Sequence, residues 1–591
     1  MMRPEQAQEQ HWDVIVVGGT PGGIMAAIAA ARSGATALLL ERTEHIGGLP
    51  ANGLGVTDIA TLGATRGLFG EFIDRVYRHY VSTYGADSQQ VHDCARGYHF
   101  EPSVAERIFE QMIGEHAEAI TVLRMRQFDS LPQRVVREGG RVLAIQVLDR
   151  RTGSLETYRG KAFIDATYEG DLAAAAGAEF RTRREGAHEY NEPLAGRVFK
   201  RWGGGVEPGS TGEGDDTIQA YNYRLCLTDN PDNQVPIQRP ATYRREEYVS
   251  LIDDIKLNRM AGVANGELYL DGMGRIVNII RVPNGKTDSN NQHLALISTD
   301  LPEENYPWPT ADWAWRDRFA QRLRDYTLGL LWFAQNDEEL PAEFRAQCRR
   351  WGFARDEYTD NGCFPRQVYV REGRRIEGEH LFVAADALPV SPGARPPIYA
   401  TSVTASHYAL DSHAVRKREP GKTCLDGFLS HPTVPYTVPV GVMIPRGLDN
   451  VLTPVPVSGT HIGFSTLRME PCWMALGQAA GVAAAMAVRS NQPMRSLDVA
   501  ILQRRLLEQG AVLIYYRDIE PTHPAFKAVQ FYGVRGAIPD WYARADDPVT
   551  AEDVERWTAI AGQGLDEVRI GIDTRGQVLQ RLYERSGPTL R

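Results

Sequence analysis

The chain has 591 residues, of which 43% are hydrophobic, and a formal net charge of -10 at pH 7. This length and composition predict a large buried core divided over two or three domains, and they exclude a disordered chain. The acidic balance, without a long Lys/Arg run, argues against a nucleic-acid partner.

The N-terminal run, MMRPEQAQEQHW, is polar and lacks the apolar stretch of a secretory signal. The apolar runs elsewhere are expected to break before they reach the roughly 20 residues of a membrane-spanning helix. We therefore expect a soluble, cytoplasmic protein that does not bind membranes.

A strand–turn–helix–strand pattern follows. Residues 13–17, DVIVV, predict a buried parallel strand, the glycine-rich residues 18–23 predict a tight turn, and the Ala-rich residues 24–34 predict a helix. A second strand, 36–40, ends at Glu41. In such a unit the turn amides approach a pyrophosphate at the positive end of the helix, and the carboxylate binds the adenosine ribose.

Thr20 departs from the GxGxxG pattern, because it occupies the second glycine position. Its side chain narrows the approach of a phosphate, but its hydroxyl can donate a hydrogen bond to that phosphate. The complete unit predicts a dinucleotide site, and NAD satisfies it as well as FAD.

Two later segments favour FAD. Residues 161–177, KAFIDATYEGDLAAAAG, predict a strand, an Asp165-Ala166-Thr167 turn and a helix that starts near Gly170-Asp171. This pattern resembles the second motif of glutathione-reductase-type flavoproteins. Residues 450–488 predict a strand, a polar loop and an Ala/Gly-rich helix. In that fold the equivalent helix directs its N-terminus at the flavin pyrimidine ring, where its dipole stabilises negative charge on the reduced ring.

The runs GGTPGG, FIDATYEGDL, YVREGRRIEGEHL and SGTHIGFSTLRMEPCWMALGQAAG resemble the FAD-dependent oxidoreductase family that is often called xanthan-lyase-like, over about residues 12–515. The resemblance implies an α/β fold with a Rossmann-like FAD-binding domain of the glutathione-reductase type. The run GGLPANG, residues 47–53, departs from the pattern expected beside the isoalloxazine. From residue 523 onward the chain resembles a single S-layer-homology-like helical module.

The FAD-binding domain is expected to be discontinuous, because its sheet elements come from separated stretches. We predict a first part at 12–184, an inserted α+β cap domain at 185–434, a closing part at 435–495 and a helical C-terminal module at 496–591. No separate NAD(P)H-binding unit is evident. The six cysteines lie far apart without a CxxC pair, which argues against a redox disulfide or a metal site.

FAD is expected to be bound non-covalently. His45 lies four residues after Glu41, which is close enough to suggest a covalent flavin link, but a hydrogen-bonding role is preferred. The predicted cofactor-binding residues are Val17, Gly18, Gly19, Thr20, Pro21, Gly22, Gly23, Glu41, Arg42, Gly47, Gly48, Ala166, Thr167, Gly170, Asp171, Ser458, Arg468 and Glu470.

Removal of a hydride from a substrate requires a base near the flavin. His461 is the first candidate, because it lies between the late strand and the Ala/Gly-rich helix and titrates near neutral pH; alternatively it only hydrogen-bonds the cofactor or a loop. Arg468 could offset charge on the reduced flavin or hold a substrate carboxylate, although a structural salt bridge to Glu470 is favoured. The further catalytic candidates are His413, Tyr223 and Arg224.

These features predict an FAD-dependent dehydrogenase or oxidase that moves a hydride from a C–OH or C–N bond of a small polar metabolite to flavin N5. A carbohydrate-like substrate is one candidate, and the electron acceptor is oxygen or a carrier. The RMEPCW–GQAAG stretch is also similar to thiazole synthases, so an enzyme that uses a bound adenine dinucleotide as scaffold or reactant is the alternative. A catalytically idle binding module is the third reading, and the sequence is compatible with a homo-oligomer.

Overall fold

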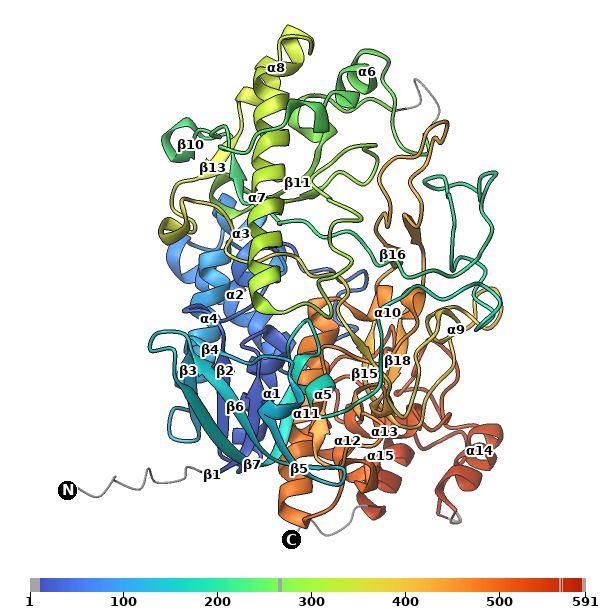
Figure 1. Cartoon of the computed structure of the whole chain (residues 1–591). Coiled ribbons are helices and arrows are strands. Elements are labelled where there is room, and N and C mark those ends of the chain that lie inside the picture. Colours follow the sequence, from blue (N-terminus) through green and yellow to red (C-terminus); the bar gives the residue numbers. More distant parts are fainter. Residues whose placement is uncertain (1–10, 264–267, 563–564, 566, 587–591) are drawn as a thin grey trace, which may run out of the picture.

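The computed structural model describes residues 11–263, 268–562, 565 and 567–586 (Figure 1). Within these residues, eight strands form the main sheet in the order β3-β2-β1-β7-β6-β4, with β19 paired to β7 and β5 paired to β6. The strands are β1 (His11–Val17), β2 (Ala37–Glu41), β3 (Ile120–Arg124), β4 (Arg126–Gln127), β5 (Val135–Glu138), β6 (Arg141–Asp149), β7 (Leu155–Asp165) and β19 (Val451–Leu452).

Strand β7 has both parallel and antiparallel neighbours. Its first half pairs antiparallel with β6, and its second half lies parallel to β1 and β19. The register places Val17 opposite Asp165, so the turns that follow β1 and β7 open at the same edge of the sheet. In open α/β sheets, ligands bind in the crevice at this carboxyl edge.

Both faces of the sheet are covered, which explains the uninterrupted apolar run of β1. Val14 and Val16 belong to one buried cluster, and Ile15 and Val17 belong to another. The first face packs against α1, α2, α4 and α11, and the second packs against α5 and the β5–β6 hairpin. These helices, with the short α3, are α1 (Pro21–Arg32), α2 (Leu68–Tyr84), α3 (Gln89–Asp93), α4 (Pro102–Gly114), α5 (Asp171–Ala175) and α11 (Glu470–Ser490).

Helices α1 and α11 pack backbone to backbone through glycines. A Cβ atom added to Gly477 would lie 2.0 Å from the carbonyl oxygen of Gly22, and one added to Gly481 would lie 2.2 Å from that of Ala26. Contrary to our expectation, α11 is long and apolar enough to cross a membrane by length and composition. However, 89% of its most apolar window is buried, as in a core helix.

The chain between α5 and α9 contains a separate antiparallel sheet, β10-β13-β9-β12-β11, beside the long helix α7 (Figure 1). Asp312 begins α7 by accepting a hydrogen bond from the Trp315 amide. The elements are β9 (Leu227–Thr228), β10 (Gln234–Val235), α6 (Ser250–Lys256), β11 (Val277–Val282), β12 (Lys286–Asn291), α7 (Trp313–Asn336), α8 (Ala342–Arg349) and β13 (Gly352–Ala354).

Three strand pairs, β8–β14, β15–β18 and β16–β17, connect these regions. The segment expected as a polar loop before α11 contains a short helix, α10. The elements are β8 (Phe180–Arg181), β14 (Arg375–Ile376), α9 (Ala384–Ala387), β15 (Ser402–Ser406), β16 (Leu410–Ser412), β17 (Leu429–His431), β18 (Tyr436–Pro439) and α10 (His461–Leu467).

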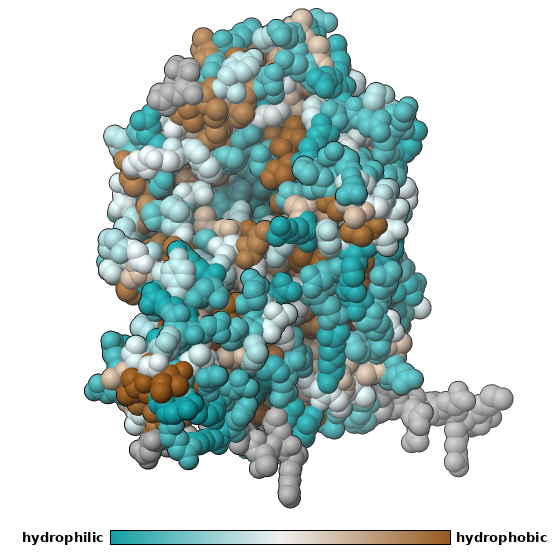
Figure 2. Space-filling view, turned by 180° about the vertical axis from the view of Figure 1, so that it is seen from behind, coloured by the Kyte–Doolittle hydropathy of each residue, from teal (hydrophilic) through white to brown (hydrophobic). Residues whose placement is uncertain are grey.

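The C-terminal helices form their own apolar cluster around Trp557 and Val578, which also includes Ala405 of β15. The helices are α12 (Val499–Glu508), α13 (Phe526–Gly533), α14 (Ala551–Ala561) and α15 (Arg575–Arg585). The rear face of the molecule is mostly hydrophilic, with small separate apolar patches (Figure 2). An α/β fold with a mixed sheet is thus present. The boundaries of the four predicted domain segments stay predictions.

Candidate active site

A cleft opens where β1, β2 and β7 end. Gly18 and Thr20 line it from the first turn, Glu41 from the end of β2, and Thr167 from the turn after β7. The cleft has a cavity volume of about 150 Å³.

Thr20 joins the two turns. Its hydroxyl donates to the carbonyl oxygen of Ala166 at 2.8 Å and accepts from the Gly23 amide at 3.2 Å, so Thr20 is the N-cap of α1. The hydroxyl is therefore used within the protein, whereas the sequence had indicated a donor to phosphate. The second glycine position tolerates Thr because its side chain points to the β7 turn.

The glycines allow the two turns to approach closely. Gly18 has a φ of +106°, and a Cβ atom there would lie 2.7 Å from the Ala166 oxygen. Among the described residues, the amides of Thr20 and Gly22 find no hydrogen-bond acceptor. Free amides at the start of a helix form an anion site, so this end of the cleft fits a pyrophosphate.

Glu41 closes the other side of the turn. Its carboxylate accepts hydrogen bonds from the amides of Gly19, at 2.9 Å, and Thr43, at 2.7 Å. Burial raises the pKa of Glu41 above its ordinary value despite these bonds. Arg42 lies 3.9 Å over the Trp313 ring and also lines the cleft. A carboxylate beside an aromatic-backed wall fits the ribose and adenine of a dinucleotide.

A second polar group lies where α11 begins. The Tyr168 hydroxyl donates to Glu470 and accepts from the Leu49 amide at 3.2 Å. Burial raises the pKa of Glu470 to about 8. The second carboxyl oxygen of Glu470 and the indole N–H of Trp473 are buried, and no partner for them occurs in the described part of the chain. Such atoms fit a polar ligand beside the first turn of α11, because buried polar groups are normally hydrogen-bonded.

The predicted cofactor residues divide into two groups. Ser458 packs against Gly378 and lines no described cavity, and Asp171 is held by Arg316 and Arg374 at 2.6 Å each. Their cofactor roles stay predictions. The residues that line the cleft are Val17, Gly18, Thr20, Glu41, Arg42, Gly48, Thr167 and Asp171. The predicted residues that do not line it are Gly19, Pro21, Gly22, Gly23, Gly47, Ala166, Gly170, Ser458, Arg468 and Glu470.

Strand β16 brings three predicted catalytic residues together. Asp411 pairs with Arg468 at 3.0 Å, and the Ser412 hydroxyl lies 3.0 Å from Nε2 of His461. His413 follows directly and contacts Asp300 through Nδ1 at 2.8 Å. His461, Arg468 and His413 therefore belong to one buried polar cluster, although they come from two distant parts of the chain.

His461 begins α10 and is buried. Its Nδ1 lies 2.9 Å from a carboxylate oxygen of Glu372, so both ring nitrogens face protein groups. His461 lines none of the described cavities. This geometry fits the alternative in which His461 hydrogen-bonds a neighbouring segment, and its role as a base stays a prediction.

The favoured salt bridge between Arg468 and Glu470 is wrong. Arg468 donates to the Tyr369 hydroxyl at 2.8 Å and pairs with Asp411, whereas Glu470 accepts from Tyr168. Burial opposes ionisation of Asp411, but His413 and Arg468 outweigh it and hold the pKa of Asp411 at about 2.

The remaining two candidates, Arg224 and Tyr223, make different contacts. Arg224 pairs with Asp288 at 2.7 Å and lies 5.7 Å from the Tyr369 ring. Tyr223 stands apart, because its hydroxyl donates to the Ala320 carbonyl at 3.1 Å. Tyr369 and Glu372 are functional candidates that were not predicted from the sequence, although both lie in the run YVREGRRIEGEHL.

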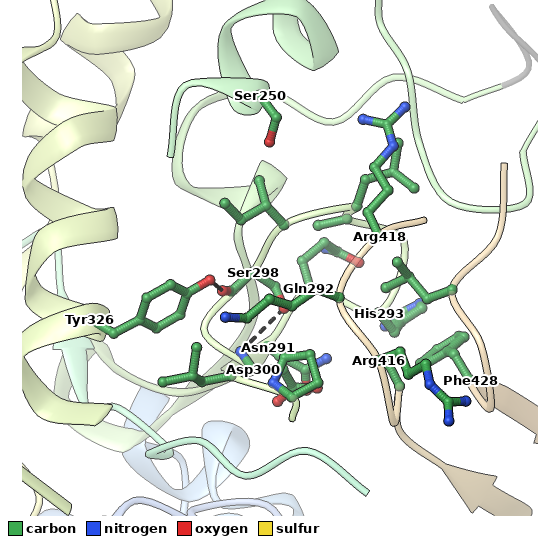
Figure 3. A pocket seen from close by; sticks show the side chains of 18 of the residues that line it. Ser250, Asn291, Gln292, His293, Ser298, Asp300, Tyr326, Arg416, Arg418 and Phe428 are labelled. Carbon is green, nitrogen blue, oxygen red and sulfur yellow. Dashed lines mark hydrogen bonds between the residues drawn. The ribbon is translucent and has the colours of Figure 1, made fainter. Parts of the chain in front are cut away.

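Residues 368–371 separate the cleft from a second cavity. Val368 and Val370 line the cleft, whereas Tyr369 contacts Arg468 and Arg371 pairs with Asp300 at 2.9 Å. This alternation is that of extended backbone, in which successive side chains point to opposite sides. Asp300 lines the second cavity, which has a volume of about 310 Å³ (Figure 3).

His45 lines the cleft with both ring nitrogens engaged. Nδ1 lies 2.6 Å from Glu106 and Nε2 lies 3.2 Å from Asp360. The hydrogen bond to Glu106 raises the pKa of His45. A covalent flavin link through this ring would require one of these contacts to break.

A family model described as FAD dependent oxidoreductase matches residues 13–506. Three solved structures are similar to parts of the chain. A glycerol-3-phosphate dehydrogenase from Bacillus halodurans complexed with FAD is 12% identical over 34% of this chain and 45% of that chain, with a TM-score of 0.21. A bacillithiol disulfide reductase from Bacillus cereus is 18% identical over 27% of this chain and 40% of that chain, with a TM-score of 0.18.

The third structure, a p-nitrophenol 4-monooxygenase from Pseudomonas putida, is 13% identical over 30% of this chain and 46% of that chain, with a TM-score of 0.20. The chain therefore spans less than half the length of each of these three proteins. No curated protein matches the chain significantly.

Proposed function

The chain belongs to the FAD dependent oxidoreductase family, and we propose that it is a dehydrogenase or oxidase acting on a C–OH or C–N bond of a small polar metabolite. FAD is the cofactor and, when bound, accepts the hydride from carbon, after which dioxygen or an electron carrier takes the two electrons. The proton of the substrate hydroxyl or amine passes to a base of this chain, and the product is a carbonyl or an imine.

One observation carries this proposal: a buried histidine–carboxylate pair between the two cavities. His413 contacts Asp300 through Nδ1 at 2.8 Å, and Asp300 lines the second cavity. Nε2 of His413 lies 3.7 Å from a carboxylate oxygen of Asp411, so both ring nitrogens face carboxylates, and His413 lines none of the described cavities. A histidine held by a carboxylate is a usual form of a general base.

The cofactor end of the site is formed by groups that suit FAD. Glu41 and the free amides at the start of α1 would hold the adenosine and the pyrophosphate. The unpartnered polar atoms of Glu470 and Trp473 would face the rest of the cofactor. Residues 368–371 would then lie in the wall that the cofactor cleft shares with the second cavity.

The parallel strand pairs lie in the main sheet. In the described residues, the parallel pairings between named strands all involve β1, β2, β3, β7 or β19. We propose a substrate, and not a nicotinamide, as the source of electrons.

An anaerobic photometric screen tests the proposal. Purified protein is mixed with sugars, polyols, amines and hydroxy acids, and the visible flavin absorbance is followed. We expect one of these classes to bleach the flavin and NADH or NADPH to leave it oxidised. Rapid bleaching by NAD(P)H alone would contradict the proposed direction.

The variant His413→Ala tests the base. We expect substrate-dependent bleaching to slow by about 10²–10⁴-fold, the usual contribution of a general base, while the flavin content stays at the wild-type level. His92→Ala, which changes a histidine whose side chain is 84% exposed, is the matched control. The variant His461→Ala is measured in parallel to distinguish the roles of the two histidines. If bleaching slows in His461→Ala and not in His413→Ala, His461 is the base.

The alternatives make different predictions. The family match does not favour a thiazole-synthase-like enzyme, and a binding module would hold a flavin that no metabolite reduces. The family match ends at residue 506, so the S-layer-homology-like character of the C-terminal helices stays part of this proposal. The cytoplasmic location and a homo-oligomeric state are likewise proposed and not tested.

A further inference from the structure

The second cavity lies between α7, the loop after β12 and the chain before β17. Figure 3 shows neutral hydrogen-bonding side chains around its middle, including Gln292, Ser298 and Tyr326. The Tyr326 hydroxyl donates to the Ser298 carbonyl at 2.9 Å, and the Ser298 hydroxyl accepts from the Asp300 amide at 3.3 Å, so its own O–H remains for a ligand. Asn291 accepts a hydrogen bond from Arg371 through its Oδ1, so its amide N–H groups remain for a ligand.

Aromatic rings form one side of the cavity. His293 and Phe428 line it. Trp202 stacks beside them, with its ring centroid 4.3 Å from that of His293 and 6.2 Å from that of Phe428. The Trp202 residue is 44% exposed, although large apolar side chains are usually buried. Trp202 does not itself line the cavity, but it contacts both lining rings, which offer an apolar surface to a ring-shaped ligand.

Trp202 precedes three consecutive glycines in the segment 200–205. A Cβ atom at Gly203 or Gly205 would meet nothing within 4 Å, so these glycines are not required by packing. Gly203 has a φ of +66°, so its backbone conformation favours glycine.

The charges around the cavity are compensated. Arg416 pairs with Asp426 at 2.8 Å, Arg418 with Asp254 at 3.0 Å, and both guanidinium groups point away from the middle of the cavity (Figure 3). The Asp300 carboxylate is held by Arg371 at 2.9 Å and by His413.

Burial also lowers the pKa of His293, which favours its neutral ring. A charged ligand would therefore lose its hydration without gaining a free counter-charge inside the cavity. These features favour an uncharged ligand that carries many hydroxyl groups.

We propose that this cavity binds a neutral sugar ring, with the Trp202–His293–Phe428 stack against the C–H face of the ring and Asn291 and Ser298 bound to its hydroxyls. The inference rests on the proposed function, because it names the substrate class of the same enzyme. Asp300 lines the cavity and contacts Nδ1 of His413, so it connects the cavity to the predicted base.

Binding is measured on the oxidised holoenzyme by isothermal titration. The probes are methyl α- and β-glucopyranosides, galactopyranosides and mannopyranosides, with glucuronate and glucosamine as charged analogues. We expect one neutral glycoside to bind with a stoichiometry of one per chain and the charged analogues to bind at least about tenfold more weakly. Binding of none of the neutral glycosides, or tighter binding of a charged analogue, would overturn the proposal.

The variant Trp202→Ala is expected to weaken that binding at least about tenfold, and Phe428→Ala is expected to do the same. Tyr542→Ala, which removes a ring that is 41% exposed in the C-terminal region, is the matched control and should bind as the wild type does. Unchanged affinity in Trp202→Ala and Phe428→Ala would overturn the site.

The same preparations separate this inference from the proposed function. Anaerobic bleaching is measured beside binding. If a glycoside binds through Trp202 and never bleaches the flavin, the site stands and the proposed reaction fails. If another metabolite bleaches the flavin equally fast in wild type and in Trp202→Ala, the reaction stands and the sugar site fails.

Discussion

At the scale of single residues, Glu470 is the carboxyl group with the clearest consequence for stability. Burial raises its pKa from 4.5 to about 8 in the folded protein. The folded chain therefore holds a proton that the unfolded chain releases at lower pH. The stability that this proton contributes is fully present below pH 4.5 and is lost progressively as the pH rises to about 8. Above pH 8, Glu470 no longer changes the free energy of unfolding with pH.

The variant Glu470→Gln should remove this pH dependence, because an amide does not titrate and can still accept from Tyr168. Relative to the wild type, we expect its free energy of unfolding to rise between pH 4.5 and pH 8 by on the order of a few kcal/mol. Urea unfolding at several pH values, with and without added FAD, measures this. Glu338→Gln, at an exposed carboxylate, is the control. Parallel loss of stability in the wild type and Glu470→Gln would refute the argument.

Glu41 is the residue on which adenosine recognition should depend. The variant Glu41→Gln loses a charged acceptor, and we expect FAD to bind about 10–100-fold more weakly, as is usual for charge-assisted hydrogen bonds of about 1.5–3 kcal/mol. Fluorescence titration of the apoprotein with FAD gives the dissociation constant. Glu44→Gln should not change it, because Glu44 is an exposed partner of Arg151. Equal affinities in Glu41→Gln and the wild type would exclude Glu41 from the site.

The residues near Glu41 could be predicted because their signal is local. A strand, a glycine turn and a helix N-terminus follow one another within residues 13–34, so the sequence pattern determines the geometry. The partner of Arg468 could not be predicted in this way. Asp411 lies 57 positions away in a short hairpin, and only the fold brings the two side chains together.

At the scale of secondary-structure elements, the α1–α11 contact places both ends of the cofactor site. Helix α1 presents its N-terminus to the cleft, and α11 carries Glu470 and Trp473 at its start. The two helices meet at Gly22 and Gly477, so their relative position depends on the absence of a side chain there.

The variant Gly477→Ala should destabilise the protein, because its Cβ atom would lie 2.0 Å from the Gly22 carbonyl oxygen. We expect a loss of about 1–3 kcal/mol from overpacking, together with weaker FAD binding as α1 is displaced. Gly114→Ala, at the end of α4 with open space around the added Cβ, should be neutral or stabilising by up to about 1 kcal/mol. Thermal unfolding compares the two variants, and equal stability would contradict the packing argument.

The Ala/Gly-rich helix predicted within residues 450–488 is confirmed as α11, and most of its residues are buried. The short helix α10 was not predicted, because seven residues carry too little periodicity to distinguish a helix from a polar loop. Its N-cap, Thr460, was the local signal available, since the Thr side chain accepts from the Gly463 amide.

At the scale of the whole molecule, the C-terminal helices are attached to strand β15. The Ala405 amide donates to the Val512 carbonyl, and the Ser402 hydroxyl donates to the Leu513 carbonyl, both at 2.8 Å. Ala405 and Trp557 belong to the same apolar cluster. Strand β15 thus depends on residues beyond 510 for part of its hydrogen bonding and burial.

Truncation after Gly510 should therefore affect the entire protein. We expect the shortened chain to aggregate or to unfold at a lower temperature, because the apolar surface around Ala405 and Leu507 becomes exposed. Size-exclusion chromatography and thermal unfolding measure this. A monodisperse product with unchanged unfolding temperature and flavin content would instead identify the C-terminal helices as an independent module.

The central claim is that one FAD lies non-covalently in the cleft at the ends of β1, β2 and β7. Acid precipitation of the purified protein, followed by quantification of FAD in the supernatant, tests it most directly. We predict about one equivalent of free FAD per chain after reconstitution and no yellow colour in the pellet. A coloured pellet would contradict non-covalent binding, and a protein that remains colourless after incubation with FAD would contradict the site itself.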